Sequence, residues 1–209
     1  SAFGLQGQKC SACSRVYVHN DIKEAFEEKL VELTQKINVG DPTSKDNWMG
    51  PVINKGVFQE YQQFTAELRE KGTILHGAKV FDLNGYYVAP TIVNNLPDDH
   101  YLWKQEMFLP IVTITGFDDP QEAMDKANDV EYGLTAGFFS EDEDEIEWFL
   151  DNIQAGVLYV NRESGATTGA WPGYQAFGGW KASGSTGKAA GSRYYVQQYM
   201  REQSQTVVD

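Results

Sequence analysis

The sequence is poor in cysteine and histidine, and these shortages exclude several classes of protein. Only two cysteines occur in 209 residues, which is too few for a disulfide scaffold. The three histidines, His19, His76 and His100, show no metal-ligand spacing, so we expect structural or surface roles for them. No apolar run approaches the roughly 18 residues that span a bilayer, and the first residues do not resemble a signal peptide. We therefore expect a reducing compartment, the cytoplasm or, in a eukaryote, the mitochondrial matrix.

Positive charge is also scarce. Lysine and arginine number 17 against 30 aspartates and glutamates, which gives a net charge of −13. This balance argues against nucleic acid and against anionic membranes as partners, and it is typical of a well-solvated surface. The Gly-x-Gly-x-x-Gly fingerprint and the Walker phosphate loop are both absent.

The hydrophobic pattern predicts alternating helices and strands. One apolar stripe predicts a helix over residues 21–37, and its members are Ile22, Phe26, Leu30, Leu33 and Ile37. A second helix runs through Val57 to Leu68 and ends at Gly72. The later elements are strand-prone stretches at 73–77, 86–93 and 110–117, a helix at 120–129, a strand at 135–140, an acidic helix through Ile146 and Ile153, and a strand at 156–161. This order predicts an α/β fold, a mostly parallel sheet flanked by helices.

The last quarter of the chain differs in character. A glycine-rich segment begins near Glu163, and its aromatic residues indicate an ordered loop; they are Trp171, Tyr174, Phe177 and Trp180. Residues 191–209 are aromatic and β-branched, which favours an arm strand that pairs with another subunit. We expect one domain over 1–190, an oligomerisation arm over 191–209, and a homo-oligomer.

The two cysteines form a Cys10-x-x-Cys13 pair near the start of the chain. A thioredoxin-type motif opens a helix, whereas the residues after Cys13 are strand-like, and a zinc site would need a second pair of ligands. An inert buried pair is a further alternative. The remaining interpretation is one nucleophilic thiol, with Lys9 beside it to favour the thiolate. The base that such a thiol needs is then a carboxylate of this chain or lies outside it.

Five stretches, in order along the chain, resemble motifs of the aldehyde dehydrogenase superfamily. They are "FGLQGQKCSACSR", "GDPTSKDNWMGPVI", "GYYVAPTIV", "KQEMFLPIV" and "AFGGWKASG", the last with Ala176 where the superfamily has proline. The resemblance implies the catalytic domain of that fold. Within the superfamily it points to the branch of proline catabolism that oxidises glutamate γ-semialdehyde to glutamate with NAD, and NADP stays possible.

The resemblance also implies roles for single residues. Cys10 matches the nucleophile that forms a thiohemiacetal with the aldehyde, and its backbone N–H would supply part of the oxyanion hole. Glu106 matches the glutamate that holds the nicotinamide ribose hydroxyls of the cofactor, because a carboxylate accepts two hydrogen bonds from a diol. Phe108 matches the aromatic residue that packs beside the nicotinamide.

For the substrate, Ser11, Gly169 and Ala170 match the residues that anchor its α-carboxylate. Phe177 matches an aromatic wall of the aldehyde tunnel, and Cys13 matches no residue with a role. The superfamily's glutamate base, its second oxyanion donor and its dinucleotide-binding fold correspond to segments upstream of this sequence. We therefore expect a catalytic domain without its cofactor domain, which would not reduce NAD alone.

Three rival interpretations stay open at this point. The first is a dehydrogenase of the same superfamily for another aldehyde, or a CoA-acylating one. The second is a non-catalytic partner-binding domain of the same fold. The third is a Cys-x-x-Cys redox protein.

Overall fold

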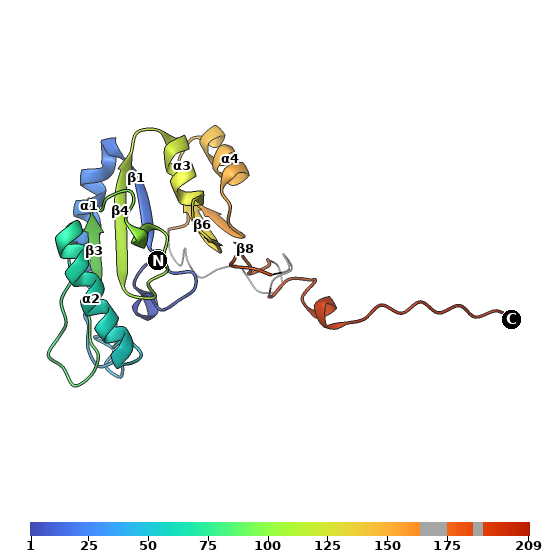
Figure 1. Cartoon of the computed structure of the whole chain (residues 1–209), viewed down its shortest axis with the longest axis horizontal. Coiled ribbons are helices and arrows are strands. Elements are labelled where there is room, and N and C mark those ends of the chain that lie inside the picture. Colours follow the sequence, from blue (N-terminus) through green and yellow to red (C-terminus); the bar gives the residue numbers. More distant parts are fainter. Residues whose placement is uncertain (164–174, 186–189) are drawn as a thin grey trace. The chain divides into compact units, whose positions relative to one another are not determined.

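The chain folds into two compact units, Ser1–Val130 and Glu131–Asp209, in a computed structural model (Figure 1). The structure describes residues 1–163, 175–185 and 190–209. Residues 164–174 and 186–189 of the predicted glycine-rich loop lie outside this description, among them Gly169, Ala170, Trp171 and Tyr174.

A four-stranded sheet forms the centre of the first unit (Figure 1). Its order is β1 (Arg15–His19), β4 (Ile111–Phe117), β3 (Thr91–Asn94) and β2 (Thr73–His76). β4 pairs in parallel with β1 on one side and with β3 on the other, and β2 is antiparallel to β3. The prediction of a mostly parallel sheet is confirmed.

The second predicted helix is confirmed as α2 (Lys55–Lys71). Asn54 caps its start, because the Asn54 side chain accepts a hydrogen bond of 3.0 Å from the Val57 N–H. Gly72 follows the last turn, as its position in the sequence predicts. The later predicted helix near residue 120 is α3 (Pro120–Asn128), which begins with proline at the helix start.

The first helix, α1 (Asn20–Thr34), is shorter than predicted, and its buried face matches the predicted stripe only in part. Ile22, Phe26 and Leu33 are exposed, so the predicted stripe is wrong at these positions. Leu30 and Ile37 do pack against the core, together with Val31, and the helix ends at buried Thr34.

Polar residues explain this difference. Lys23 and Glu27, one turn apart on α1, form an ion pair of 2.7 Å and are mostly shielded from solvent. The Asn94 side chain at the end of β3 donates to both Glu27 carboxylate oxygens at 3.0 Å. A charged pair that is hydrogen-bonded in this way can face the protein interior, so hydrophobic periodicity alone misplaces the face.

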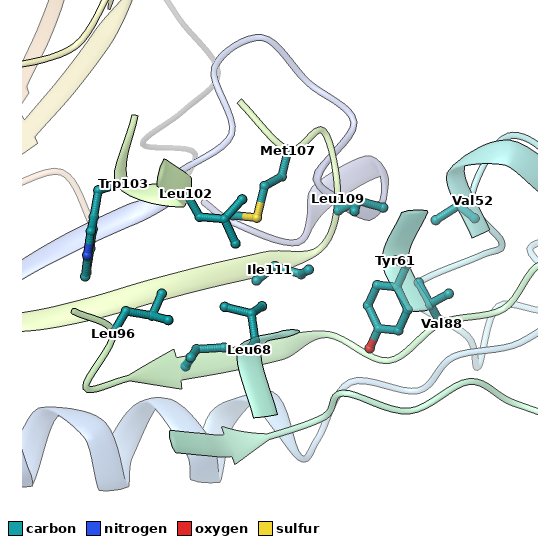
Figure 2. Packing of buried hydrophobic residues seen from close by; sticks show 11 residues of the cluster. Val52, Tyr61, Leu68, Val88, Leu96, Leu102, Trp103, Met107, Leu109 and Ile111 are labelled. Carbon is teal, nitrogen blue, oxygen red and sulfur yellow. The ribbon is translucent and has the colours of Figure 1, made fainter. Parts of the chain in front are cut away.

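The sheet is buried on both faces. On one face, Ile111 packs in one cluster with the α2 residues Tyr61 and Leu68 (Figure 2). Val93 belongs to the same cluster. On the other, Ile92, Val112 and Ile114 pack near Leu30 and Val31 of α1. Neighbouring strand residues therefore enter opposite clusters, which explains why these strands read as continuous apolar runs.

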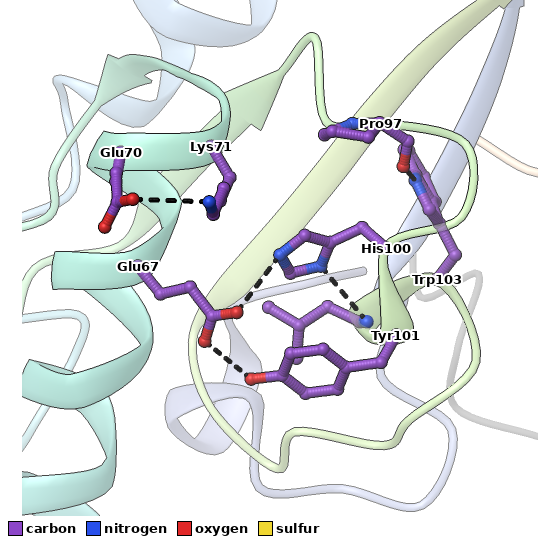
Figure 3. A network of polar contacts seen from close by, with 8 residues as sticks. Glu67, Glu70, Lys71, Pro97, His100, Tyr101 and Trp103 are labelled. Atoms are coloured by element: carbon purple, nitrogen blue, oxygen red, sulfur yellow. Dashed lines mark hydrogen bonds and ion pairs between the residues drawn. The ribbon is translucent and has the colours of Figure 1, made fainter.

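A polar network connects α2 to the short helix η2 (Tyr101–Trp103) (Figure 3). Glu67 accepts a hydrogen bond of 2.7 Å from the Tyr101 hydroxyl and lies 3.3 Å from His100 Nε2. His100 Nδ1 in turn accepts from the Leu102 N–H at 3.3 Å, which caps the short helix. Desolvation, together with the Glu67 carboxylate, raises the pKa of Tyr101 to about 12. His100 thus takes a structural position, as the sequence predicts.

The second unit contains a parallel pair of strands, β6 (Thr135–Phe138) and β7 (Val157–Val160). Helix α4 (Glu143–Asn152) joins them, and its Phe149 ring stacks on Phe138 at a centroid distance of 4.7 Å. A small antiparallel pair, β5 (Tyr132–Gly133) and β8 (Trp180–Lys181), completes the described strands of this unit.

The segment predicted as an oligomerisation arm, residues 191–209, contains one short helix, η3 (Val196–Tyr199), and no strand within the described positions. A strand needs a neighbour for its backbone hydrogen bonds, so pairing of this segment with another subunit stays a prediction. Among the described residues, no helix is long and apolar enough to cross a membrane.

Tyr61 ties α2 to the start of β3 from inside the core. Its side chain is fully buried, and its hydroxyl lies 2.8 Å from the Ala89 carbonyl oxygen and 2.8 Å from Thr91 Oγ1. Burial raises the pKa of Tyr61 to about 12, so the hydroxyl stays protonated and can donate.

The variant Tyr61→Phe should therefore lower the free energy of unfolding by about 1–3 kcal/mol, because it removes the buried hydroxyl and its hydrogen bonds with the Ala89 carbonyl and Thr91 Oγ1. Urea titration measures the change. Tyr86→Phe, at an exposed ring of the same unit, is the matched control and should stay within about 0.5 kcal/mol of the wild type. Equal stability of the two variants would contradict the role given to the Tyr61 hydroxyl.

Candidate active site

Cys10 lies in a tight turn directly before the first strand. The turn spans Lys9 to Ala12 and is closed by a hydrogen bond of 3.0 Å from the Ala12 N–H to the Lys9 carbonyl oxygen. Cys10 occupies its second position and is exposed. This arrangement presents a thiol to a ligand on a short, hydrogen-bonded piece of backbone.

Cys13 has a different environment. It packs against the core cluster beneath α1, and its thiol donates to the Arg15 carbonyl oxygen at 3.4 Å. Burial raises the pKa of the Cys13 thiol. Of the two cysteines, Cys10 thus has the accessibility that a nucleophile requires, whereas Cys13 resembles a small buried residue.

Glu106 and Phe108 stand on a segment whose side chains alternate between solvent and core. Glu106 and Phe108 are exposed, whereas Met107 and Leu109 are 6% and 3% exposed and belong to the cluster of Figure 2. Phe108 has a left-handed backbone, with φ of 54°. Partial desolvation raises the pKa of the Glu106 carboxyl. A carboxylate and an aromatic ring are therefore displayed together on backbone that the core holds in place.

The fold brings the Cys10 turn and the Glu106–Phe108 segment to the same edge of the sheet. The turn leads into β1, the second segment leads into β4, and these two strands are parallel neighbours. Their amino ends therefore lie side by side. Arg15, the first residue of β1, pairs with Thr113, near the start of β4.

A close backbone contact joins the same two segments. Gly7, with φ of 70°, lies so near the Leu109 carbonyl oxygen that an added Cβ would stand 2.1 Å from that oxygen. Leu5 and Gln6 before it also have left-handed backbones, with φ of 52° and 59°. Three such residues in a row bend the chain before Cys10 so that Gly7 can approach Leu109.

Two glutamines connect this loop to the segment before α2, and sequence reasoning assigned no role to either. The Gln8 side-chain oxygen accepts a hydrogen bond of 3.2 Å from the Ile53 N–H. The Gln6 amide, turned so that its oxygen faces Gly50, accepts at 2.9 Å from the Gly50 N–H and donates to the Leu5 carbonyl at 3.1 Å. The sequence shows only that two glutamines precede Cys10 and that a Gly-Pro-Val-Ile stretch follows later in the chain. It does not show which glutamine binds which backbone group of that stretch.

The predicted substrate residues are only partly described. Ser11 is 4% exposed and has a polar or electrostatic partner within the protein. Gly169 and Ala170 lie outside the described residues. Phe177 belongs to the second unit, where it is half-buried and its N–H donates to the Ala190 carbonyl at 2.9 Å. The convergence of these residues on one carboxylate stays a prediction.

Within the part of the chain that the structure describes, no group of three or more His, Cys, Asp or Glu residues could hold a metal ion.

Comparison with known proteins gives one consistent result. The model of the aldehyde dehydrogenase family matches residues 1–205. The 1-pyrroline-5-carboxylate dehydrogenase of Bacillus mycoides is 41% identical over 194 residues, which cover 93% of this chain and 37% of that protein. The chain thus spans a little over a third of the length of this relative.

Solved structures agree. A 1-pyrroline-5-carboxylate dehydrogenase from Thermus with bound NAD has a TM-score of 0.87 and 33% identity, over 94% of this chain and 37% of that one. Proline utilization A from Bdellovibrio bacteriovorus has a TM-score of 0.89 and 36% identity, over 96% of this chain and 20% of that one.

The different environments of the two cysteines predict selective alkylation. Iodoacetamide should label Cys10 at least about ten times faster than Cys13, because only the first thiol is exposed and the pKa of the second is raised. Peptide mass spectrometry over a time course measures both rates in the same molecule. In urea the two rates should converge; faster labelling of Cys13 in the native chain would revive the redox-pair interpretation.

The Gly7 contact predicts a large effect from one methyl group. Gly7→Ala should lower the free energy of unfolding by more than about 1 kcal/mol, because alanine is disfavoured at this φ and its Cβ meets the Leu109 carbonyl. Gly4→Ala is the matched control, since an added Cβ there has no atom within 4 Å. Urea titration of both variants would reject the contact if Gly7→Ala were as stable as Gly4→Ala.

Proposed function

The chain belongs to the aldehyde dehydrogenase family, and from this premise we propose that it provides the catalytic thiol for NAD-dependent oxidation of glutamate γ-semialdehyde to glutamate. The observation that carries the proposal is the exposed Cys10 turn at the same sheet edge as Glu106 and Phe108. The relatives named as 1-pyrroline-5-carboxylate dehydrogenases support this substrate, which is the hydrolysed, open form of that cyclic imine.

In the proposed reaction, the Cys10 thiolate adds to the aldehyde carbon and forms a thiohemiacetal. The carbonyl oxygen becomes an oxyanion, and the backbone N–H of Cys10 would donate a hydrogen bond to it. NAD, when bound, would supply the hydride acceptor. Loss of hydride from the thiohemiacetal leaves a thioester on Cys10, and attack by water then releases the carboxylic acid and restores the thiol.

The residues present fit NAD in two respects. Glu106 is an exposed carboxylate whose two oxygens suit the two hydroxyls of a ribose. The Phe108 ring is 42% exposed although it is aromatic, and its neighbours Met107 and Leu109 fix it from the core side. An exposed ring on a firmly held backbone suits one face of the nicotinamide.

Recognition of the substrate's α-carboxylate is proposed for Ser11, with the backbone N–H groups of Gly169 and Ala170, and Phe177 is proposed as a wall of the aldehyde site. Ser11 directly follows the nucleophile, so a group bound there lies at a fixed distance from the reacting carbon. Backbone N–H groups of a glycine-containing loop suit an anion because the chain can approach it closely.

The proposed carboxylate anchor is tested by comparing glutamate γ-semialdehyde with butyraldehyde, using the whole protein that carries this chain. Each hydrogen bond to a charged group is worth roughly 1.5–3 kcal/mol, so two or three should favour the charged aldehyde by about two or more powers of ten in kcat/KM. Ser11→Ala should reduce this preference and leave butyraldehyde nearly unaffected. Equal wild-type efficiency on the two aldehydes would move the function to a general aldehyde dehydrogenase.

The nucleophile is tested separately in the same protein. Cys10→Ala should abolish NADH formation, measured at 340 nm, while Cys13→Ala should retain most of it, because only Cys10 forms the covalent intermediate. Equal losses in the two variants would contradict the assignment. Both variants should still bind NAD, measured by fluorescence quenching, and this binding would show that they remain folded.

A further inference from the structure

Resting on the proposed function, we propose that Gln8 is a positioning residue for Cys10: its side-chain oxygen binds the Ile53 N–H and so fixes the nucleophile turn against the start of α2. Gln8 stands two residues before Cys10, and its acceptor contact at 3.2 Å spans 45 positions of the chain. It touches no reacting atom in this role and acts through the backbone that carries Cys10.

The donor of this hydrogen bond, the Ile53 N–H, is held in place by its neighbours. Val52 is 2% exposed, belongs to the core cluster, and donates its own N–H to the Tyr86 carbonyl at 3.0 Å. Asn54 caps α2. Ile53 lies between these two fixed residues, so its N–H is a rigid donor, although its side chain is 74% exposed.

The loop that carries Gln8 needs such a restraint. The left-handed residues Leu5 and Gln6 hold the loop in a conformation that an isolated chain rarely adopts. Gly7 is held on one side, at the Leu109 carbonyl. Gln8 provides a second restraint through Ile53, at the start of α2. The chain before Cys10 is thus held at Leu109 and at Ile53, two positions of the first unit that are distant in sequence.

The chemistry of the contact sets the test, because Gln8 uses only its acceptor oxygen toward Ile53. Glutamate keeps that oxygen, whereas methionine has nearly the same shape and lacks it. Displacement of a reacting group by about 1 Å can cost about a hundredfold in rate. In the whole protein that carries this chain, Gln8→Met should therefore lower kcat about a hundredfold and leave KM for NAD within about twofold.

Gln8→Glu should keep kcat within about threefold of the wild type, because its carboxylate accepts the same hydrogen bond. Gln59→Met, at an exposed position of α2, is the matched control and should leave kcat unchanged. Wild-type kcat in Gln8→Met would overturn the proposal, and so would a Gln8→Glu variant as slow as Gln8→Met.

A second measurement separates this inference from the proposed function. Amide hydrogen exchange on the 209-residue chain should be about tenfold faster at Ile53 in Gln8→Met than in the wild type, while the Val52 amide, bonded to Tyr86, keeps its rate. Unchanged exchange at Ile53 would overturn the contact whatever the activity. If the wild type reduces no NAD with any aldehyde but Ile53 responds as expected, the proposed function fails and the restraint on the Cys10 turn stands.

Discussion

The parallel pairing of β1 with β4 is the constraint on which the rest of the site depends. Cys10 and Glu106 are almost a hundred residues apart in sequence, and each lies a few residues before one of these strands. The start of the pairing is fixed by Thr113, whose N–H and hydroxyl both donate to the Ser14 carbonyl, at 2.9 and 3.1 Å. A shift of one residue would turn every side chain of β1 to the other face, so the register also fixes where the Cys10 turn begins.

The two site segments combine an immobile interior with an exposed surface. Met107 and Leu109 sit in the core, so the backbone between them can hold Phe108 in a left-handed conformation with its ring toward solvent. On the other segment, Gly7 contacts the Leu109 carbonyl, and Cys10 three residues later is exposed. Burial thus stabilises local strain at the two places where a ligand would be met.

Much of the fold could be predicted from the sequence, because strands buried on both faces and capped helices leave strong local signals. The apolar stretch over β4, and Gly72 after α2, gave correct elements. The buried face of α1 could not be predicted, since Glu27 is shielded only through Lys23 and Asn94, and Asn94 is distant in sequence. The pairing of residues 191–209 with another subunit stays a prediction, because a strand depends on a partner that composition does not specify.

The site shows the same division between local and long-range information. Cys10, Glu106 and Phe108 stood out because their residue types and motifs are recognisable without a structure. Gln8 did not, because a glutamine near a cysteine has no function until the donor that faces it is known, and Ile53 is 45 positions away. Candidate reactive groups can therefore be proposed from short motifs, whereas candidate restraints on them become visible only as tertiary contacts of ordinary polar residues with backbone.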